Sequence, residues 1–190
     1  MNLPHRFFFA SLLAAGAVAS AAQTTARLQP AQSEVTFVTK QMGVPVEGKF
    51  RTFDASLDLD PKKPESGSAS VQIMMLSALL GVPEADTELP KSTWFDSAKF
   101  PEATFRSTAI KGLGNGKFVV NGKLTIKNIV RDLVVPVTIT QSGGTSTATG
   151  SFTVKRLDFT IGQGEWTDTT VVANDVQVKF KLAFTGLAPL

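Results

Sequence analysis

The chain of 190 residues has no cysteine and no tyrosine, and its only histidine is His5, close to the N-terminus. The lack of cysteine excludes disulfides, thiol nucleophiles and the acylated cysteine of a lipoprotein. Beyond position 5 the chain also lacks the side chain that most often moves protons near neutral pH and ligates zinc. These absences argue against ordinary hydrolases, redox enzymes and metalloproteins together. We therefore expect a non-enzymatic protein with no metal site and no cofactor.

The N-terminal residues have the pattern of a secretory signal peptide. Arg6 supplies a positive charge, residues 7–18 form an apolar run, and residues 19–22 are small, as signal peptidase requires. The apolar run is only about half of the roughly 20 residues that a membrane-spanning helix needs. We therefore expect residues 1–22 to be a signal peptide that is cleaved after Ala22.

Residues 23–190 have a length typical of a single domain with one hydrophobic core. Because disulfides are excluded, that core must supply the stability. The charges nearly balance, with 19 Lys and Arg against 16 Asp and Glu, and they form no basic stripe with interleaved aromatic residues. Nucleic-acid binding is therefore not expected.

Apolar and polar residues alternate along much of the chain, which is typical of β-strands with one buried face. In residues 117–127, for example, Phe118 and Val120 share one side, and Lys117 and Lys123 share the other. Clear alternation marks 117–127, 175–185, 133–140, 147–155 and 55–60. Weaker alternation marks 34–40, 44–50, 69–75 and 103–110, which gives about eight or nine strands.

Turn-forming residues separate several of these strands, notably at 61–67, 112–116, 127–128 and 143–144. Such short connections favour antiparallel neighbours. Strands with polar outer faces must bury their inner faces, and closing the sheet on itself also removes exposed edges. The sequence therefore predicts an all-β fold, an antiparallel barrel of about eight strands.

Residues 76–101 lose the alternation and predict a short helical insertion. Asp86 or Thr87 is expected to cap the helix, with Pro90 tolerated only in its first turn. An insertion of this kind lies most naturally over one mouth of the barrel or along its outer wall. The aromatic residues expected to form a lid or a plug are Trp94, Phe95 and Phe100.

Small residues and one proline interrupt the inner faces of the strands. The small residues either leave room for one ligand or mark bulges and bends, and the sequence favours neither; they are Gly48, Gly122, Ala148 and Gly150. Pro136 has no N–H for a neighbouring strand, so a bulge or a gap is expected there. A gap would offer a ligand entrance, but an ordinary strand irregularity is the interpretation that we favour.

Several motifs follow one another in a specific order through nearly all of residues 23–190. They are Ser33-Glu34-Val35-Thr36-Phe37, Val46-Glu47-Gly48-Lys49-Phe50, Leu89-Pro90-Lys91-Ser92-Thr93-Trp94-Phe95-Asp96, Val120-Asn121-Gly122-Lys123-Leu124-Thr125-Ile126 and Arg156-Leu157-Asp158-Phe159-Thr160-Ile161-Gly162. In this order they resemble the YceI-like family of secreted polyisoprenoid-binding proteins. The resemblance implies a lipocalin-like barrel that holds a long isoprenoid chain, in a periplasmic and non-enzymatic protein. The chain departs from the family pattern at Gln41, where histidine is frequent, and at Thr160, where glycine is frequent.

The resemblance predicts a periplasmic carrier for an isoprenoid quinone or a polyprenyl phosphate. An isoprenoid tail binds through apolar area alone, which fits the residues expected inside the barrel and near its mouth. These candidate ligand-binding residues are Phe37, Phe50, Trp94, Phe95, Phe105, Phe118, Leu124, Val135, Phe152, Val178 and Phe180. Candidates for the head group are Lys91, Arg106 and Arg156, because a diphosphate favours cations, whereas a quinone needs only a hydrogen-bond donor. An ion pair with Asp158 is the alternative role for Arg156.

Other functions stay open. The chain could be a secreted protein-binding or inhibitor module that acts through its loops, which a large exposed apolar patch would favour. A hydrolase based on Asp158 with Glu165 or Asp168, or on a Lys91-Ser92 dyad, has little support, because neighbouring strand residues face opposite sides. The sequence is also compatible with transient contact with a membrane or membrane protein, and with a homodimer.

Overall fold

The computed structural model describes residues 26–190, so the predicted signal peptide lies outside the described residues. Its eleven strands form one antiparallel sheet. The strands are β1 (Ala26–Leu28), β2 (Glu34–Gln41), β3 (Val44–Phe50), β4 (Phe53–Asp58), β5 (Ser68–Met74), β6 (Ala78–Leu79), β7 (Glu102–Gly114), β8 (Lys117–Ile126), β9 (Ile129–Ser142), β10 (Thr145–Lys155) and β11 (Asp175–Thr185). The helices are α1 (Pro83–Glu88) and the 3-10 helices η1 (Pro30–Gln32), η2 (Pro64–Ser66), η3 (Met75–Ser77), η4 (Arg156–Phe159) and η5 (Gly164–Thr167).

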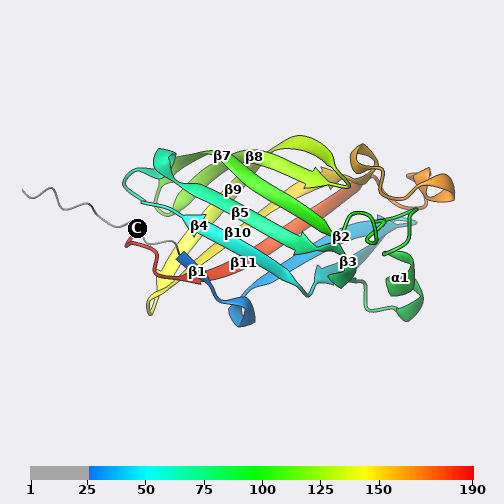
Figure 1. Ribbon diagram of the computed structural model, residues 1–190, viewed down its shortest axis with the longest axis horizontal. Helices are drawn as coiled ribbons and strands as arrows, with labels where there is room; N and C mark the ends of the chain where they lie inside the picture. The colour runs from blue at the N-terminus through cyan, green and yellow to red at the C-terminus, as the bar shows by residue number, and fades with distance from the viewer. Residues whose placement is uncertain (1–25) are drawn as a thin grey trace, which may run out of the picture.

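Strand β1 closes the sheet into a barrel. Its Leu28 pairs with Phe184 of β11, and its Ala26 pairs with Leu57 of β4. Strands β1 and β2 both pair with β11 and form one wall strand that is interrupted by η1. Strands β3 and β4 follow one another in the same way and form the next wall strand. The closed barrel therefore has eight strands. The predicted eight-stranded antiparallel, lipocalin-like barrel is confirmed (Figure 1).

Two-residue turns connect four pairs of neighbouring strands, and both residues of each turn have positive φ angles. They are Met42-Gly43, Asn115-Gly116, Lys127-Asn128 and Gly143-Gly144. Positive φ at both positions is the requirement of a type I′ turn, whose twist matches that of the flanking strands. Strand β7 continues to Gly114, further than the sequence predicted. The turn that follows it therefore consists of only two residues, Asn115 and Gly116.

The predicted inner faces of the strands are buried or half-buried in the structure. In β8, Phe118, Val120 and Leu124 are buried, whereas Lys117 and Lys123 are exposed. Buried residues form two clusters, one toward the barrel end that carries α1 and η4, and one toward the opposite end, where the C-terminus lies (Figure 1). The space between the strand faces is thus the apolar interior of the barrel.

The helical insertion exists, but its helix begins earlier than predicted. Helix α1 starts at Pro83, which suits the first helical position because its φ is fixed and it has no N–H to satisfy. Asp86 does not cap the helix; its carboxylate instead accepts a hydrogen bond from the N–H of Leu80. The predicted cap at Asp86 or Thr87 is therefore wrong. The missed strands β1 and β6 are only three and two residues long, too short to show alternation.

Candidate functional site

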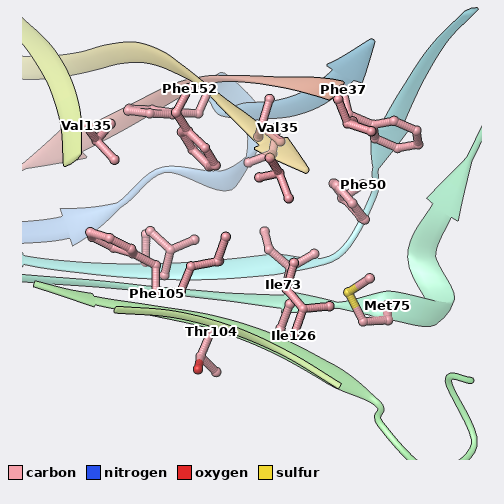
Figure 2. Close-up of a pocket in the computed structure, with 18 of the residues that line it drawn as sticks. Val35, Phe37, Phe50, Ile73, Met75, Thr104, Phe105, Ile126, Val135 and Phe152 are labelled. Atoms are coloured by element: carbon pink, nitrogen blue, oxygen red, sulfur yellow. The ribbon is translucent and has the colours of Figure 1, made fainter. Parts of the chain in front are cut away.

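An elongated apolar cavity, here called the lumen, lies inside the barrel. Its volume is about 340 Å³, within the range of roughly 300–1,000 Å³ that is typical of small-molecule sites. It is lined by members of both buried clusters, such as Phe118 and Ile139 from one and Leu89 and Val154 from the other. Figure 2 shows Phe152 and Val35 on one wall facing Phe105 and Ile73 across this space.

All the ligand-binding candidates predicted from the sequence line the lumen. These are Phe37, Phe50, Trp94, Phe95, Phe105, Phe118, Leu124, Val135, Phe152, Val178 and Phe180. The strand candidates lie there because each sits at an inward position of its strand. Contact of these side chains with a ligand stays a prediction.

Three phenylalanine rings lie across glycines of a neighbouring strand. The pairs are Phe37 with Gly48, Phe105 with Gly122 and Phe180 with Gly150, and a Cβ at any of these glycines would come within 3.0 Å of the ring. The space that each glycine leaves is thus occupied by a ring, an arrangement found where aromatic residues cover strand glycines. A β-bulge also lies beside Gly122, between Ser107 and Ala109. The glycines therefore do not enlarge the lumen directly, but let large rings lie flat along its wall.

Arg156 lies at the α1 end of the lumen and is 2% exposed. Its five N–H groups donate to five backbone carbonyls, those of Ile161, Gly162, Trp166, Val172 and Ala173. Burial lowers the pKa of Arg156, but a guanidinium keeps its charge in proteins. Arg156 thus fastens residues 161–173 to the barrel and has no N–H left for a ligand.

Comparison with known proteins identifies the family. The YceI-like domain model matches residues 27–184 of the chain. This chain belongs to the YceI-like family. A UPF0312 protein from Shewanella baltica (strain OS155 / ATCC BAA-1091) is 33% identical over 127 residues, and the match spans 66% of this chain and 66% of that protein. The chain thus matches slightly less than two thirds of the length of such curated relatives.

Solved structures of similar proteins share the barrel. BcnA from Burkholderia cenocepacia is 44% identical, with a TM-score of 0.80 over 82% of this chain and 98% of that chain. A polyisoprenoid-binding domain from Saccharophagus degradans, implicated in plant cell wall breakdown, has a TM-score of 0.68 at 18% identity. It covers 88% of this chain and 99% of that one, a likeness that shows the fold alone.

The remaining head-group candidates of this YceI-like chain do not reach the lumen as free cations. The Lys91 Nζ donates to the carboxylate of Glu88 on the exposed end of α1. Arg106 is exposed on β7, beside the inward-facing Phe105. The alternative ion pair of Arg156 with Asp158 is also wrong, because all five Arg156 donors go to backbone carbonyls.

The YceI-like barrel wall has a gap in its pairing beside Pro136. Pairing between β9 and β10 ends at Val137 and Gly150, and residues 151–155 of β10 pair only with β11. Pro136 has no N–H to donate at the position where this pairing stops, whereas the pairing of β9 with β8 continues through Val119 and Pro136. Arg131 of β9 donates to the carbonyl of Asp158, which places η4 beside this gap. Of the bulge or gap expected at Pro136, the structure shows a gap in the pairing of β9 with β10, and a ligand entrance at this place stays a prediction.

Trp94 and Phe95 lie at the α1 end of the lumen, where a lid or plug was expected. The Trp94 ring packs on that of Trp166, with centroids 5.5 Å apart. Lys127 Nζ donates to the Trp94 carbonyl (3.0 Å) and to the Thr160 carbonyl (2.9 Å), which ties this segment to the β8–β9 turn. Burial lowers the pKa of Lys127, and nearby Asp96 raises it in part.

Sequence reasoning missed several lining residues. Thr39 and Gln41 continue the inward row of Val35 and Phe37 along β2, so the alternation could have found them. Trp166 lies in the 3-10 helix η5, which is too short to show a periodic pattern in the sequence.

Two of the side chains considered for catalysis, Asp168 and Lys91, take part in other interactions. A hydrogen bond from the Thr170 hydroxyl, with one from its backbone N–H, holds the pKa of Asp168 below its usual value. Within residues 26–190 no cluster of His, Cys, Asp and Glu could hold a metal ion. In the same part of the chain, no helix is long and apolar enough to cross a membrane.

Proposed function

We propose that this protein holds one elongated isoprenoid lipid in the lumen and carries it without chemical change. The observation behind this proposal is the continuous apolar lumen that spans both buried clusters. The YceI-like family supports it, and so does the fold shared with a polyisoprenoid-binding domain. The predicted signal peptide supports a periplasmic location for the carrier.

The physics of an isoprenoid tail matches this interior. A hydrocarbon forms no hydrogen bonds, so it gains about 0.8 kcal/mol for each CH2-sized unit removed from water, before ordering costs. The walls offer rings and branched aliphatic side chains such as Phe105, Phe152 and Val178 along the length of the barrel. A long chain therefore collects many small gains that a compact ligand would not.

Delivery of such a lipid requires contact with a membrane or with a protein that carries the lipid. Val130 and Val134 on the outer face of β9 are 47% and 60% exposed, and they lie on the strand that borders the gap. We place the transient membrane contact there. Other exposed large apolar residues belong to separate elements, such as Met42 in the β2–β3 turn and Leu113 in β7, so a protein-binding module finds less support.

The direct test is to purify the protein from the periplasm, extract it with organic solvent and identify the extracted lipid by mass spectrometry. We expect an isoprenoid lipid, and we expect added isoprenoid quinone or polyprenyl phosphate to raise the melting temperature of the emptied protein by mass action. An empty protein that gains no stability from either lipid would overturn the proposal.

A matched pair of variants sharpens this test. Val120→Phe fills part of the lumen, whereas Val119→Phe adds the same volume to the outward neighbour on β8. Overpacking costs about 1–3 kcal/mol, so the stability of the empty proteins is measured alongside binding. We expect only Val120→Phe to reduce the ligand-induced rise in melting temperature. Equal binding by both variants would place the ligand outside the lumen.

A further inference from the structure

The outward faces of strands β8 to β11 carry more positive than negative charge. These four strands are neighbours in the sheet, and their outward faces together are here called the basic wall. The charged residues of the basic wall are five lysines and two aspartates, all of them exposed: Lys117, Lys123, Asp132, Lys155, Asp175, Lys179 and Lys181. The basic wall therefore has an excess of three positive charges near neutral pH.

Both aspartates of the basic wall pair with lysines of the same wall. The Asp132 carboxylate lies 2.8 Å from Lys123 Nζ, and the Asp175 carboxylate lies 4.0 Å from Lys155 Nζ. Three lysines of the wall form no ion pair within residues 26–190, namely Lys117, Lys179 and Lys181. The excess charge of the wall is thus located on these three side chains.

Two of the three lysines have only uncharged neighbours across the strands. The register partners of Lys117 and Lys179 on both adjacent strands are glycine, serine or threonine. Lys181 differs, because Glu34 of β2 is one of its register partners. Lys117 and Lys179 are therefore the side chains whose charge is most available to a partner.

An uncharged strip lies between Lys117 on β8 and Lys179 on β11. It consists of residues 133–142 of β9 and residues 145–154 of β10, which contain no charged side chain. The exposed apolar residues on the outer face of β9 are Val130, Val134 and Pro136. Lysine side chains are long and flexible, so those on both flanks can extend toward a flat surface that touches this strip.

Two other surfaces of the barrel carry more negative than positive charge. Strands β3, β4 and β5 lie on the far side of the barrel, separated from the basic wall by β2 on one side and by β7 on the other. Their outward faces carry one lysine and three acidic residues, which are Lys49, Glu47, Asp54 and Asp58. At the α1 end, helix α1 carries three acidic residues and no basic one. A negatively charged surface therefore favours the basic wall over either of these surfaces.

The gap between β9 and β10 lies in the uncharged strip. Pairing of the two strands stops at Val137 and Gly150, beside Pro136. Contact through the basic wall brings this gap against the partner, whereas contact through the α1 end leaves it in water. An isoprenoid tail loses free energy wherever it meets water, so a carrier benefits when the gap faces lipid directly.

On the basis of the proposed function, we infer that the barrel docks on its side, with the basic wall against a lipid surface that has negatively charged head groups. Lys117 and Lys179 contact the head groups on the two flanks of the uncharged strip. Val130 and Val134 enter the interface, and the gap faces the lipid. Each lysine near such a surface adds an attraction, which salt weakens because dissolved ions screen the charges.

The first test measures binding to two kinds of vesicle, one of phosphatidylcholine alone and one of phosphatidylcholine mixed with an equal amount of phosphatidylglycerol. Lys117→Gln/Lys179→Gln removes two charges from the basic wall. Lys62→Gln/Lys63→Gln is the matched control, because both lysines are exposed in the loop between β4 and β5. We expect all three proteins to have similar melting temperatures, since exposed lysines contribute little to stability.

We expect the wild-type protein to bind the mixed vesicles more tightly than the neutral ones. Lys117→Gln/Lys179→Gln should weaken binding to the mixed vesicles by roughly 10- to 30-fold, and the control should bind as the wild type does. Added salt should reduce the difference between the variant and the wild type. Equal binding by the variant and the wild type, or equal binding to both kinds of vesicle, would overturn the docking.

A second test reports the orientation, because the chain has no cysteine and accepts a probe at a single site. Val134→Cys, Ser56→Cys and Val82→Cys place an environment-sensitive fluorophore at exposed positions on the basic wall, on β4 and at the start of α1. We expect the mixed vesicles to shift the emission of the probe at position 134 to shorter wavelength and to leave the others unchanged. An equal or larger shift at position 82 or 56 would overturn the docking on the side.

Binding inside the lumen is measured separately on the same proteins. Lys117→Gln/Lys179→Gln changes only outward side chains, so isoprenoid quinone should raise its melting temperature as much as that of the wild type. A wild-type protein that prefers the mixed vesicles but gains no stability from either isoprenoid lipid would overturn the proposed function and not the docking. Stabilisation by lipid without a preference for the mixed vesicles would overturn the docking alone.

Discussion

At the scale of single residues, the glycines of the barrel wall show how side-chain volume is distributed between strands. The ring of Phe105 lies over Gly122. A Cβ added at Gly122 would also lie 2.5 Å from the carbonyl oxygen of Arg106. Gly112, by contrast, would place a Cβ against a single close atom, Pro64 Cγ at 3.1 Å. The two positions therefore provide the same substitution in a tight and in a loose setting.

We predict that Gly122→Ala lowers the free energy of unfolding by about 2 kcal/mol and displaces the Phe105 ring into the lumen. Gly112→Ala should change the free energy of unfolding by less than about 1 kcal/mol, because only the Pro64 ring must move slightly to accommodate the Cβ. Urea denaturation measures both effects, and ligand binding reports the narrowing of the lumen. Equal losses at the two positions would contradict the role of the ring.

Arg156 gives a second prediction at this scale. Arg156→Met leaves five buried carbonyls without their donor, so we expect a loss of about 3 kcal/mol or more in the free energy of unfolding. Arg156→Lys should recover little, because an ammonium group has three donors on a flexible stem. Arg106→Met, at an exposed position of β7, is the control. A similar midpoint of urea denaturation for all three variants would show that Arg156 does not fasten residues 161–173.

At the scale of elements, the interrupted pairing of β9 with β10 is the main departure from a regular barrel. Residues 145–150 of β10 pair on both sides, whereas residues 151–155 pair only with β11. Every second N–H group in residues 151–155 of β10 therefore points toward β9 and has no strand partner. The pairing stops next to Pro136, which has no N–H to donate at the following ladder position.

We predict that hydrogen exchange resolves the two halves of β10. Amides of residues 145–150 should be uniformly protected, and alternate amides of residues 151–155 should exchange faster. The corresponding residues 129–135 of β9 should show the same alternation on the side that faces β10. Uniform protection through both strands would mean that the wall is closed there, and the ordinary strand irregularity would then be the better interpretation of Pro136.

At the scale of the whole molecule, the described residues lack the side chains that ordinarily titrate near neutral pH. Residues 26–190 contain no histidine and no cysteine, so no side chain has an ordinary pKa between about 5 and 8. Asp168 has a lowered pKa, so its stabilising contribution is present above the unfolded value of about 3.9 and is lost as the pH falls through the folded pKa.

We therefore predict that the melting temperature and the affinity for a neutral lipid vary little between about pH 5.5 and 8, and that stability falls below about pH 4. Calorimetry across this range, with and without lipid, measures both. A midpoint that changes steeply near neutral pH would point to a titrating group that the described part of the chain does not reveal. Analytical ultracentrifugation of the same samples tests whether the protein forms the homodimer with which the sequence is compatible.

Local patterns in the sequence were enough to predict the antiparallel barrel and the strand residues that line its lumen. Alternation assigns an inward or outward side to every strand residue, so Phe37, Phe118 and Val178 could be placed inside before their neighbours were known. Turn residues such as Gly143-Gly144 limited the connections to hairpins. These features depend on local backbone geometry. Side chains of a β-strand alternate between its two faces, so the alternation of apolar and polar residues in the sequence shows which face each residue occupies.

The roles of the polar residues depend on contacts that are visible only in the folded chain. Arg156, Lys91 and Arg106 are equally plausible cations in the sequence, but their roles depend on which carbonyl, carboxylate or solvent lies beside each one. Hydrogen bonds are short and directional, and residues distant in the sequence supply the partners, so no local pattern can encode them.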